Sequence, residues 1–380
     1  MSTPIFVYGT LRDPDVLALA LGPLTCRLAP VSAHLPDHIA LRAAGGPFPA
    51  LRPRKGARAE GLLLAPMDDE IRDALDVFEG AFAFSLVPMR VVTHDGPVEA
   101  LVFEPAGTVA DTGQPWLLED WQRDDKPLML AMSREAVLGA GMPGGMLRRA
   151  IARVNATAEG QGPRHLRSDF GPGAIADHRV ARLSTGFFAL EEHHFRHRLH
   201  AGGHSESVRR EVFVTGDAVT VLPWDPKRDL VLLIEQVRAG LLGRGDPNPW
   251  NIEVIAGLID TRETPEETAR REAMEEAGLT LGRIERIAGY YASPGAVSEY
   301  LTSFVAEADL GSHAAGLHGL DGEHEDIRTL ILPREEAMQA IASGEARNAP
   351  LLLSLMGLER LRPTLGPRWT GAVAGGACAD

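Results

Sequence analysis

The sequence predicts two unlike domains joined end to end, an α+β domain followed by an α/β domain. Three observations support this fold class. At 380 residues, the chain is too long for one ordinary domain and suits two. Strand-like runs alternate with helical stretches in both halves, and no internal repeat relates the halves. Between them, residues 153–180 are rich in glycine and proline and lack periodicity, which predicts a linker.

The first domain is expected over residues 1–115, where the strand-like runs IFVYG, GLLLAP and VEALVFEP surround the helical stretch DDEIRDALDVFEG. Residues 116–152 are apolar at helical spacing and predict a helical extension packed on that domain. The second domain is expected over 181–365. Its strands include AVTVLPWD and LVLLIEQVR, and a strong helix and more strands follow them. The Gly/Ala-rich residues 366–380 predict a flexible tail.

The composition excludes several classes of protein. Lys and Arg total 38 against 52 Asp and Glu, so the formal net charge is −14, which disfavours binding to nucleic acid or anionic membranes. No run approaches the roughly 18 apolar residues of a membrane helix. The N-terminus does not resemble a signal peptide, and the two cysteines, Cys26 and Cys378, suit a reducing compartment. We therefore expect a cytoplasmic protein with neither nucleic-acid nor membrane partners.

The strong helix of the second half has explicit start and stop signals. Thr264 can cap its N-terminus, Pro265 occupies the first helical position, and Glu267 completes a Thr-x-x-Glu capping box. Gly278 can end the helix in the left-handed conformation. The pattern thus predicts a helix over residues 265–277.

This helix carries a cluster of carboxylates. Glu272 and Glu276 are four residues apart and share a face, with Glu275 beside them, and Arg271 can hold Glu275. A charged solvent face is the commoner meaning of such a helix, but the spacing resembles the Nudix box, G-x5-E-x7-R-E-U-x-E-E-x-G-U, where U is a bulky aliphatic residue. Ala273 is smaller than the usual aliphatic. The other fixed positions match at Gly257, Glu263, Arg271, Glu272, Glu275, Glu276, Gly278 and Leu279.

The resemblance implies an α/β/α sandwich whose loop–helix–loop binds two or three magnesium ions, with manganese as an alternative. By motif position, Glu272 and Glu276 are expected as metal ligands, together with the Ala256 carbonyl. Glu275 is expected as a ligand or as a partner of one. Glu263 is expected to orient the helix rather than to touch metal.

Flanking residues resemble the ADP-ribose pyrophosphatase subfamily. Pro294 lies fifteen residues after the box, and Arg238 and Glu299 occupy positions where that subfamily contacts substrate. In the acidic loop further on, Glu323 is expected as the general base and Glu325 as a metal ligand. The resemblance implies hydrolysis of ADP-ribose to AMP and ribose 5-phosphate by a homodimer. Alternatives are a nucleotide-sugar or dinucleotide hydrolase and a non-catalytic ADP-ribose sensor. Trp250, before the box, either stacks on adenine or anchors its loop in the core, and the second interpretation is favoured.

The first half carries a second candidate site. In FVYGTLRDP a short strand ends in a turn whose backbone N–H groups can hold a carboxylate, and Glu79 ends the apolar segment ALDVFEG. These residues resemble the γ-glutamylcyclotransferase (AIG2-like) family, which implies a mixed β-barrel with helices. In that family the turn, here Tyr8, Gly9, Thr10 and Leu11, binds the γ-glutamyl group, and the glutamate, here Glu79, moves a proton. Alanine follows Glu79–Gly80 where the family often has an aromatic residue, so a retained fold without catalysis is the alternative. The two-domain arrangement resembles bacterial tellurite-resistance proteins of the TrgB type, which names a phenotype and no mechanism.

Overall fold

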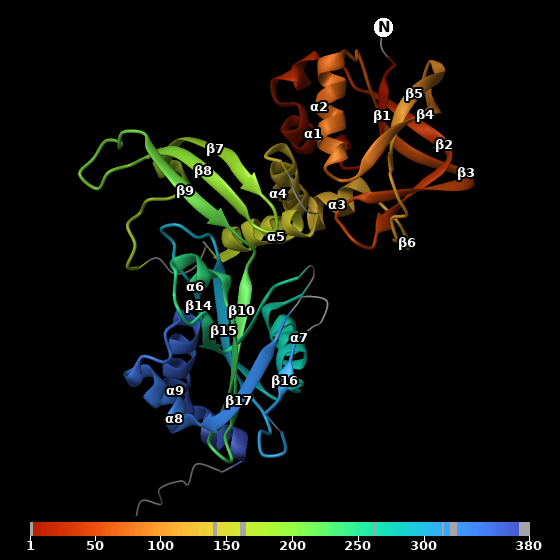
Figure 1. Cartoon of the computed structure of the whole chain (residues 1–380). Helices are drawn as coiled ribbons and strands as arrows, with labels where there is room; N and C mark the ends of the chain where they lie inside the picture. The colour runs from red at the N-terminus through yellow and green to blue at the C-terminus, as the bar shows by residue number, and fades with distance from the viewer. Residues whose placement is uncertain are drawn as a thin grey trace, which may run out of the picture. The chain divides into compact units, whose positions relative to one another are not determined.

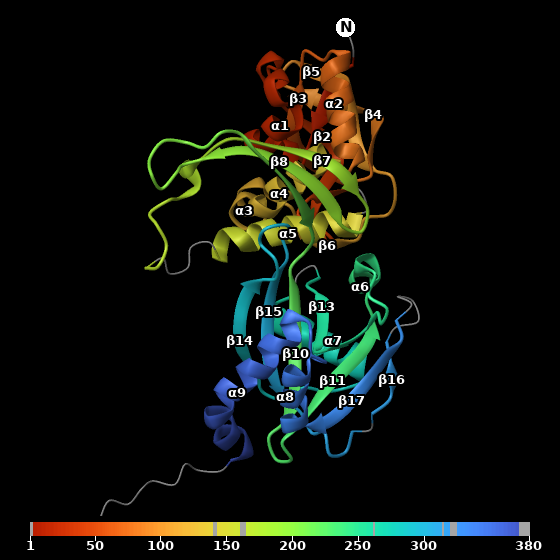
Figure 2. The same ribbon diagram turned by 60° about the vertical axis from the view of Figure 1, so that its left-hand side comes forward.

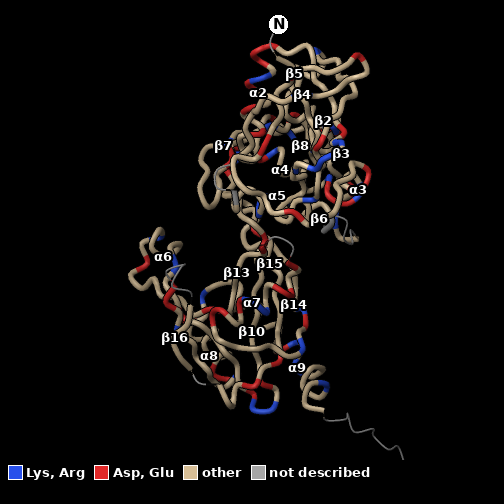
Figure 3. Tube along the Cα trace, turned by 90° about the vertical axis from the view of Figure 1, so that its right-hand side faces the viewer, with Lys and Arg blue, Asp and Glu red and all other residues tan. Residues whose placement is uncertain are grey.

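The computed structural model describes residues 3–139, 143–159, 165–260, 263–313, 315–319 and 325–371. The chain divides into two compact units, Met1–Val214 and Thr215–Asp380 (Figure 1). Each unit has its own sheets and its own hydrophobic core. Charges of both signs are interspersed along both units in the described part of the chain (Figure 3). No helix among the described residues is long and apolar enough to cross a membrane.

A closed five-stranded barrel forms the first part of unit 1. Its strands follow the order β3-β1-β5-β4-β2, and β2 pairs back with β3. The pairing of β1 with β5 is parallel and the other pairings are antiparallel, so the predicted mixed barrel is confirmed. A further strand, β6, joins β2 outside the closed circuit. The strands are β1 (Ile5–Val7), β2 (Val31–Ala43), β3 (Pro49–Leu64), β4 (Phe84–Thr93), β5 (Gly96–Pro105) and β6 (Asp111–Pro115).

Strand alternation explains how the barrel carries its helices. Phe6 and Tyr8 belong to one buried cluster, with Val91 and Val102 of the facing strands. Ile5 lies on the opposite face of β1 and packs into a second cluster, which the helices supply. These helices and helical turns are η1 (Thr10–Arg12), α1 (Pro14–Leu21), η2 (Gly22–Arg27), α2 (Asp69–Gly80), α3 (Leu118–Asp124) and α4 (Lys126–Val137).

Helix α5 (Pro143–Glu159) and a three-stranded antiparallel sheet complete unit 1. The sheet consists of β7 (Ile175–Thr185), β8 (Ala189–His197) and β9 (Val208–Val214), preceded by η3 (Pro172–Ala174). Helix α5 enters the range 153–180 expected as a linker, because Ala150 and Val154 continue its apolar face against Met132. The boundary between the units falls within the range 181–365 expected for the second domain.

Helices α4 and α5 lie beside this sheet (Figure 2), and a buried ionic cluster joins them to it. Glu135 of α4 accepts hydrogen bonds from Arg149 of α5 at 2.7 Å and from Arg182 of β7 at 2.9 Å. Arg153 bridges Glu135 to Glu191 of β8, with 2.9 Å to each carboxylate. Both glutamates are fully buried. Residues far apart in sequence therefore fix the sheet to the helices through charge-assisted bonds.

Unit 2 is an α/β/α sandwich, as predicted. Its sheet has the order β14-β15-β10-β11-β17-β16, with β12 paired to β11 and β13 paired to β10. Val219 and Val221 of β10 pack on the side of α7, whereas Leu222 and Trp224 pack with residues of α9. Both faces of the central strands are thus buried, and helices cover both (Figure 1).

The elements of unit 2 begin with β10 (Ala218–Asp225), β11 (Leu230–Val237), α6 (Ala239–Arg244), β12 (Trp250–Glu253) and β13 (Ile255–Leu258). They continue with α7 (Pro265–Ala277), β14 (Ile284–Tyr291), β15 (Tyr300–Glu307), β16 (Leu317–His318), β17 (Ile327–Pro333), α8 (Arg334–Ser343) and α9 (Ala349–Thr370). Helix α9 reaches into the range expected as a tail, because Leu365 and Trp369 are buried against the sheet. Residues 372–380 lie outside the described residues.

Candidate functional sites

The helix α7 begins and ends as the sequence predicts. The Thr264 hydroxyl accepts from the Glu267 N–H, the Glu267 carboxylate accepts from the Thr264 N–H, and Gly278 ends the helix in the left-handed region. Strand β13 runs into the loop that precedes this cap. The helix and the strand therefore hold the glutamate cluster from two sides.

Arg271 organises the carboxylates of this helix. Its Nε and Nη2 donate to the two oxygens of Glu263 at 2.9 and 3.0 Å. Its Nη1 donates to Glu272 and to Glu275, both at 2.8 Å. Arg271 therefore holds Glu275, as predicted, and also binds two further carboxylates that the sequence analysis did not connect to it. The bidentate contact agrees with an orienting role for Glu263.

Glu276 is the most buried carboxylate of the cluster. Its Oε2 accepts from the Ala256 N–H at 3.1 Å, which ties α7 to β13. Burial raises the pKa of Glu276 to about 8, against the lowering effect of that hydrogen bond. Burial likewise raises the pKa of Glu272 to about 7, and the charges of Glu275 and Glu325 add to the effect. The site thus gathers buried carboxylates that resist ionisation together.

This arrangement fits a hard divalent cation, which would replace the mutual repulsion of the carboxylates with attraction to oxygen ligands. Among the described residues, no three His, Cys, Asp or Glu side chains lie close enough together to hold a metal ion. Arg271 engages Glu272 and Glu275, and Glu276 turns one oxygen to the Ala256 N–H. The charge of Glu325 lies near enough to raise the pKa of both Glu272 and Glu276.

Arg238, at the end of β11, lies within the electrostatic reach of the glutamates. Its Nε and Nη2 donate to Glu253 at 2.9 and 2.6 Å, and Asn251 donates to the other oxygen of Glu253 at 2.7 Å. Glu299 is half-buried, and burial raises its pKa although the Arg238 charge acts to lower it. Arg238, Glu299, Glu276 and Glu325 therefore share one region of the unit.

The structure does not describe Glu323, contradicts the interpretation of Trp250 and adds Glu253 to the site. Glu323 lies outside the described residues. The interpretation that Trp250 anchors its loop in the core is wrong, because Trp250 is 53% exposed on β12. Glu253, which holds Arg238, was not predicted as a site residue. The position of Glu253 in the sequence could have suggested this role, because an acidic residue in a strand that leads to the box glycine needs a partner.

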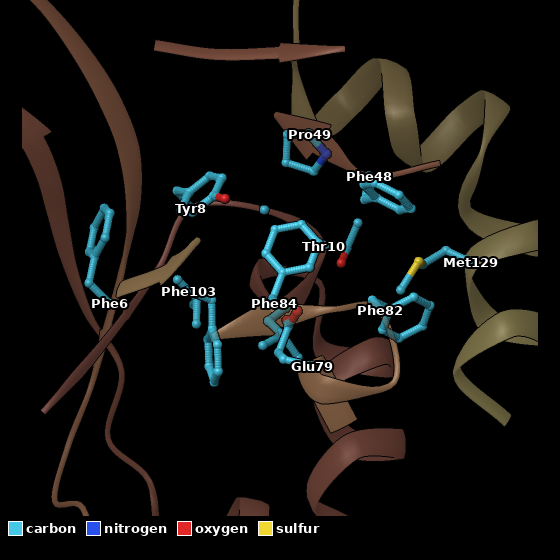
Figure 4. Close-up of a pocket in the computed structure, with 13 residues that line it drawn as sticks. Phe6, Tyr8, Thr10, Phe48, Pro49, Glu79, Phe82, Phe84, Phe103 and Met129 are labelled. Atoms are coloured by element: carbon cyan, nitrogen blue, oxygen red, sulfur yellow. The ribbon is translucent and has the colours of Figure 1, made fainter. Parts of the chain in front are cut away.

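In unit 1, the structure brings the predicted turn and Glu79 together around one pocket (Figure 4). The pocket opens to solvent, and the space within it, open solvent included, is about 440 Å³. Aromatic and apolar side chains complete the lining, which consists of Phe6, Val7, Tyr8, Gly9, Thr10, Leu11, Phe48, Pro49, Glu79, Phe82, Phe84, Phe103 and Met129. Although Ala81 replaces the expected aromatic residue, Phe82 supplies a ring one position later. Sequence analysis did not predict the other aromatic residues of this lining.

The turn between β1 and α1 leaves space for a ligand. The backbone N–H groups of Gly9, Thr10 and Leu11 donate no hydrogen bond to another described residue. A Cβ atom on Gly9 would lie 2.9 Å from Pro49 Cγ, so the turn needs glycine for this close approach. Burial raises the pKa of Glu79 to about 8, and burial with the charge of Glu79 raises that of Tyr8. Burial therefore favours the neutral form of both side chains.

Comparison with known proteins supports both halves of this description. Residues 214–355 match the NUDIX domain model, and residues 5–123 match the model described as gamma-glutamyl cyclotransferase, AIG2-like. Over 207 residues the chain is 41% identical to the ADP-ribose pyrophosphatase of Escherichia coli K12, and this match covers 54% of this chain and 98% of the relative. The ADP-ribose pyrophosphatase of Haemophilus influenzae is 38% identical over 49% of this chain and 87% of its own length.

A third relative is named for another substrate. The GDP-mannose pyrophosphatase of an Enterobacter species is 35% identical over 40% of this chain and 78% of its own length. A solved structure of an ADP compounds hydrolase covers 49% of this chain and 92% of its own, at 20% identity and a TM-score of 0.39. Nudix hydrolases in general use a divalent metal, typically magnesium. The extensive match to full-length Nudix relatives shows that the chain belongs to the Nudix hydrolase family, with an AIG2-like domain ahead of its Nudix domain.

Proposed function

We propose that unit 2 hydrolyses the pyrophosphate bond of ADP-ribose. Water attacks one phosphorus atom, the bridging P–O bond breaks, and the products are AMP and ribose 5-phosphate. The observation that carries the proposal is the pair of largely buried glutamates of α7, Glu272 and Glu276, with the cationic Arg238 near Glu276. The relatives that this chain matches over 98% and 87% of their length are named ADP-ribose pyrophosphatase, which favours ADP-ribose over other nucleotides.

The proposed ligands of two or three magnesium ions, with manganese as an alternative, are Glu272, Glu276, Glu275, Glu325 and the Ala256 carbonyl. When bound, these ions neutralise the phosphate charge and lower the pKa of water. The protein residues hold the reacting groups in position. Arg271 keeps Glu272 and Glu275 in place through hydrogen bonds of 2.8 Å.

The remaining proposed residues act on the substrate and on water. The Arg238 guanidinium, held by Glu253, would bind phosphate oxygens, and Glu299 would accept hydrogen bonds from the substrate. Glu323 is proposed as the general base that takes the proton of the attacking water. A carboxylate would suit this task, because a bound divalent metal would lower the pKa of that water.

The experiment uses the purified full chain with magnesium and a panel of ADP-ribose, GDP-mannose, ADP-glucose and diadenosine polyphosphates. We expect AMP release to be fastest from ADP-ribose and to disappear in Glu272→Gln. Glu266→Gln is the matched control, because Glu266 lies on the exposed face of the same helix. Faster hydrolysis of another panel member would show that ADP-ribose is not the preferred substrate. Tight binding of ADP-ribose without turnover would support a sensor instead.

We further propose that the protein works in the cytoplasm as a homodimer that contacts itself through its Nudix domain. The acidic composition favours small nucleotides over nucleic acid or anionic membranes as partners. The resemblance to tellurite-resistance proteins suggests that the protein acts in a response to stress. Sedimentation of the full chain, with and without substrate, tests the dimer. A monomer at the concentrations used for the activity assay would contradict it.

A second function is proposed for unit 1, because Glu79 and the turn Tyr8–Leu11 line one pocket. The α-amine of a γ-glutamyl amide would attack its own γ-carbonyl. The new N–C bond closes 5-oxoproline, the γ-amide C–N bond breaks, and Glu79 carries the proton from the attacking nitrogen to the departing amine. The backbone N–H groups of the turn would hold the γ-glutamyl group.

Release of 5-oxoproline from γ-glutamyl amides measures this activity. We expect release by the wild-type chain and none by Glu79→Gln, with Asp76→Asn, an exposed change on the same helix, as the control. Binding of a γ-glutamyl amide without release in the wild type would indicate a retained binding fold that has lost catalysis.

A further inference from the structure

We propose that the pocket of unit 1 is specific for γ-glutamyl amides whose amine part is uncharged and apolar, such as aryl-substituted alkylamines. The inference rests on the cyclotransferase function proposed above and adds the class of the leaving group. The proposal comes from the aromatic and apolar side chains that line the pocket together with the turn and Glu79.

Phe48, Phe82 and Phe84 form an aromatic wall of the pocket. The Phe48 and Phe84 rings pack edge to face at 5.9 Å between centroids, and Phe48 and Phe82 do so at 6.4 Å. The three rings come from the segment before β3, the segment after α2 and β4 (Figure 4). Such a wall offers contact area to an apolar group and no hydrogen-bond partner to a polar one.

Two glycines hold this wall against the turn. A Cβ atom on Gly46 would lie 2.4 Å from the Phe48 ring, and one on Gly9 would lie 2.9 Å from Pro49. The backbone of these glycines therefore packs directly on the side chains, which leaves Phe48 little freedom to move aside. The pocket is preformed for a flat or compact apolar group.

Helix α4 adds a further apolar contact. Met129 lines the pocket and is 2% exposed, and it lies outside residues 5–123 that match the family model. A methionine side chain is flexible and packs well against aromatic groups. The helical extension of this chain thus contributes to the pocket and makes it more apolar.

The charges around the pocket disfavour an anionic leaving group. No Lys, Arg or His is among the described residues that line it. The nearby Arg52 is occupied, because its Nε donates to Asp111 at 2.9 Å and its other nitrogens donate to the Leu51 and Val109 carbonyls. Inside the pocket, the carboxylate of an amino acid or dipeptide leaving group would lose water without meeting a cationic side chain in the lining.

The test compares 5-oxoproline release by the full chain from four γ-glutamyl amides. Their amine parts are benzylamine, butylamine, glycine and 1,4-diaminobutane. We expect kcat/KM for the benzylamide to exceed that for γ-glutamylglycine by about 100-fold or more, because an unpaired buried carboxylate is costly. Equal or faster release from the glycine or diaminobutane amide would overturn the inference while supporting the cyclotransferase itself.

The Phe48→Leu variant links the preference to the wall. We expect it to lower kcat/KM for the benzylamide about tenfold and to leave γ-glutamylglycine little changed. Val77→Ala, a change at a 72% exposed position of α2, is the control and should change neither. An equal loss on both substrates would contradict the assigned role of Phe48.

If no amide releases 5-oxoproline, the cyclotransferase proposal fails, and calorimetric titration of the wild-type chain still tests the inference. Binding of γ-glutamyl-benzylamide at least about tenfold tighter than γ-glutamylglycine would uphold an apolar pocket without catalysis. Equal affinity, or no binding of either amide, would reject the inference.

Discussion

Gly257 and Glu272 are in such close contact that a Cβ atom on Gly257 would lie 1.8 Å from the Glu272 Oε1 atom. The glycine of the box is thus needed for the position of a glutamate fifteen residues later in the chain. The Glu272 side chain is mostly buried and is held by Arg271 at 2.8 Å, so it cannot yield without losing that bond. The contact explains why strand β13 must present a residue without a side chain here.

Gly257→Ala should therefore damage activity more than folding. The Glu272 side chain can rotate to admit the methyl group, but the carboxylate then leaves its proposed metal-binding position. We expect kcat for ADP-ribose hydrolysis to fall by about 100-fold, as for other misplacements of about 1 Å in an active site. Gly240→Ala, where a Cβ meets nothing within 4 Å, is the control. Activity within twofold of wild type would show that Glu272 need not occupy this position.

Removal of Glu253 should act on substrate binding through Arg238. Two hydrogen bonds, of 2.9 and 2.6 Å, fix the guanidinium, and Glu253→Ala would release it. We expect KM for ADP-ribose to rise about tenfold, with kcat changed less, because Arg238 is proposed to bind and not to react. Glu235→Ala, which breaks a more exposed pair with Arg328, is the matched control. A loss in kcat alone would argue against the binding role.

Local features of these sites could be predicted from sequence, because they depend on neighbours along the chain. The capping box around Thr264 and the contact of Arg271 with Glu275 follow from helical spacing. The turn and Glu79 were placed together only through family resemblance. Contacts between distant segments could not be predicted, since alternation shows that a face is buried but not what covers it.

The ionic cluster and Trp250 illustrate that limit. Glu135 lies in a stretch that the sequence predicts only as a helical extension, yet it is fully buried against arginines of α5 and β7. The sequence favours a loop anchored in the core by Trp250, yet the residue is 53% exposed. The expected domain ranges stay predictions, although the compact units meet at residues 214 and 215.

Glu135→Ala should strongly destabilise unit 1. Loss of this carboxylate removes the counter-charge that the buried Arg149 and Arg182 share, although Arg182 keeps its ion pair with Glu191. Removing one partner of such a buried pair costs about 3–5 kcal/mol. We expect a lower unfolding midpoint in urea for the transition of unit 1, whereas Glu119→Ala, an exposed change on α3, should shift it little. An unchanged midpoint in Glu135→Ala would mean that the cluster contributes no net stability.

The raised pKa of Glu79 should make both stability and activity depend on pH. Its pKa is about 8 in the folded protein and 4.5 for the unperturbed side chain, so between these values the folded chain binds a proton that the unfolded chain does not. The contribution of Glu79 to stability therefore falls as pH rises through this window, by at most about 1.4 kcal/mol per pH unit.

Glu79→Gln removes this titration, so the difference in unfolding midpoint between variant and wild type isolates it. We expect the unfolding midpoint of the variant to rise relative to that of the wild type from about pH 5 to pH 8, and the difference to level off above pH 8. Because the general base must be ionised, kcat/KM for 5-oxoproline release by the wild type should rise over the same range. A rate that levels off near pH 5 would show that Glu79 is ionised in the pocket, and neither pH effect would then be expected.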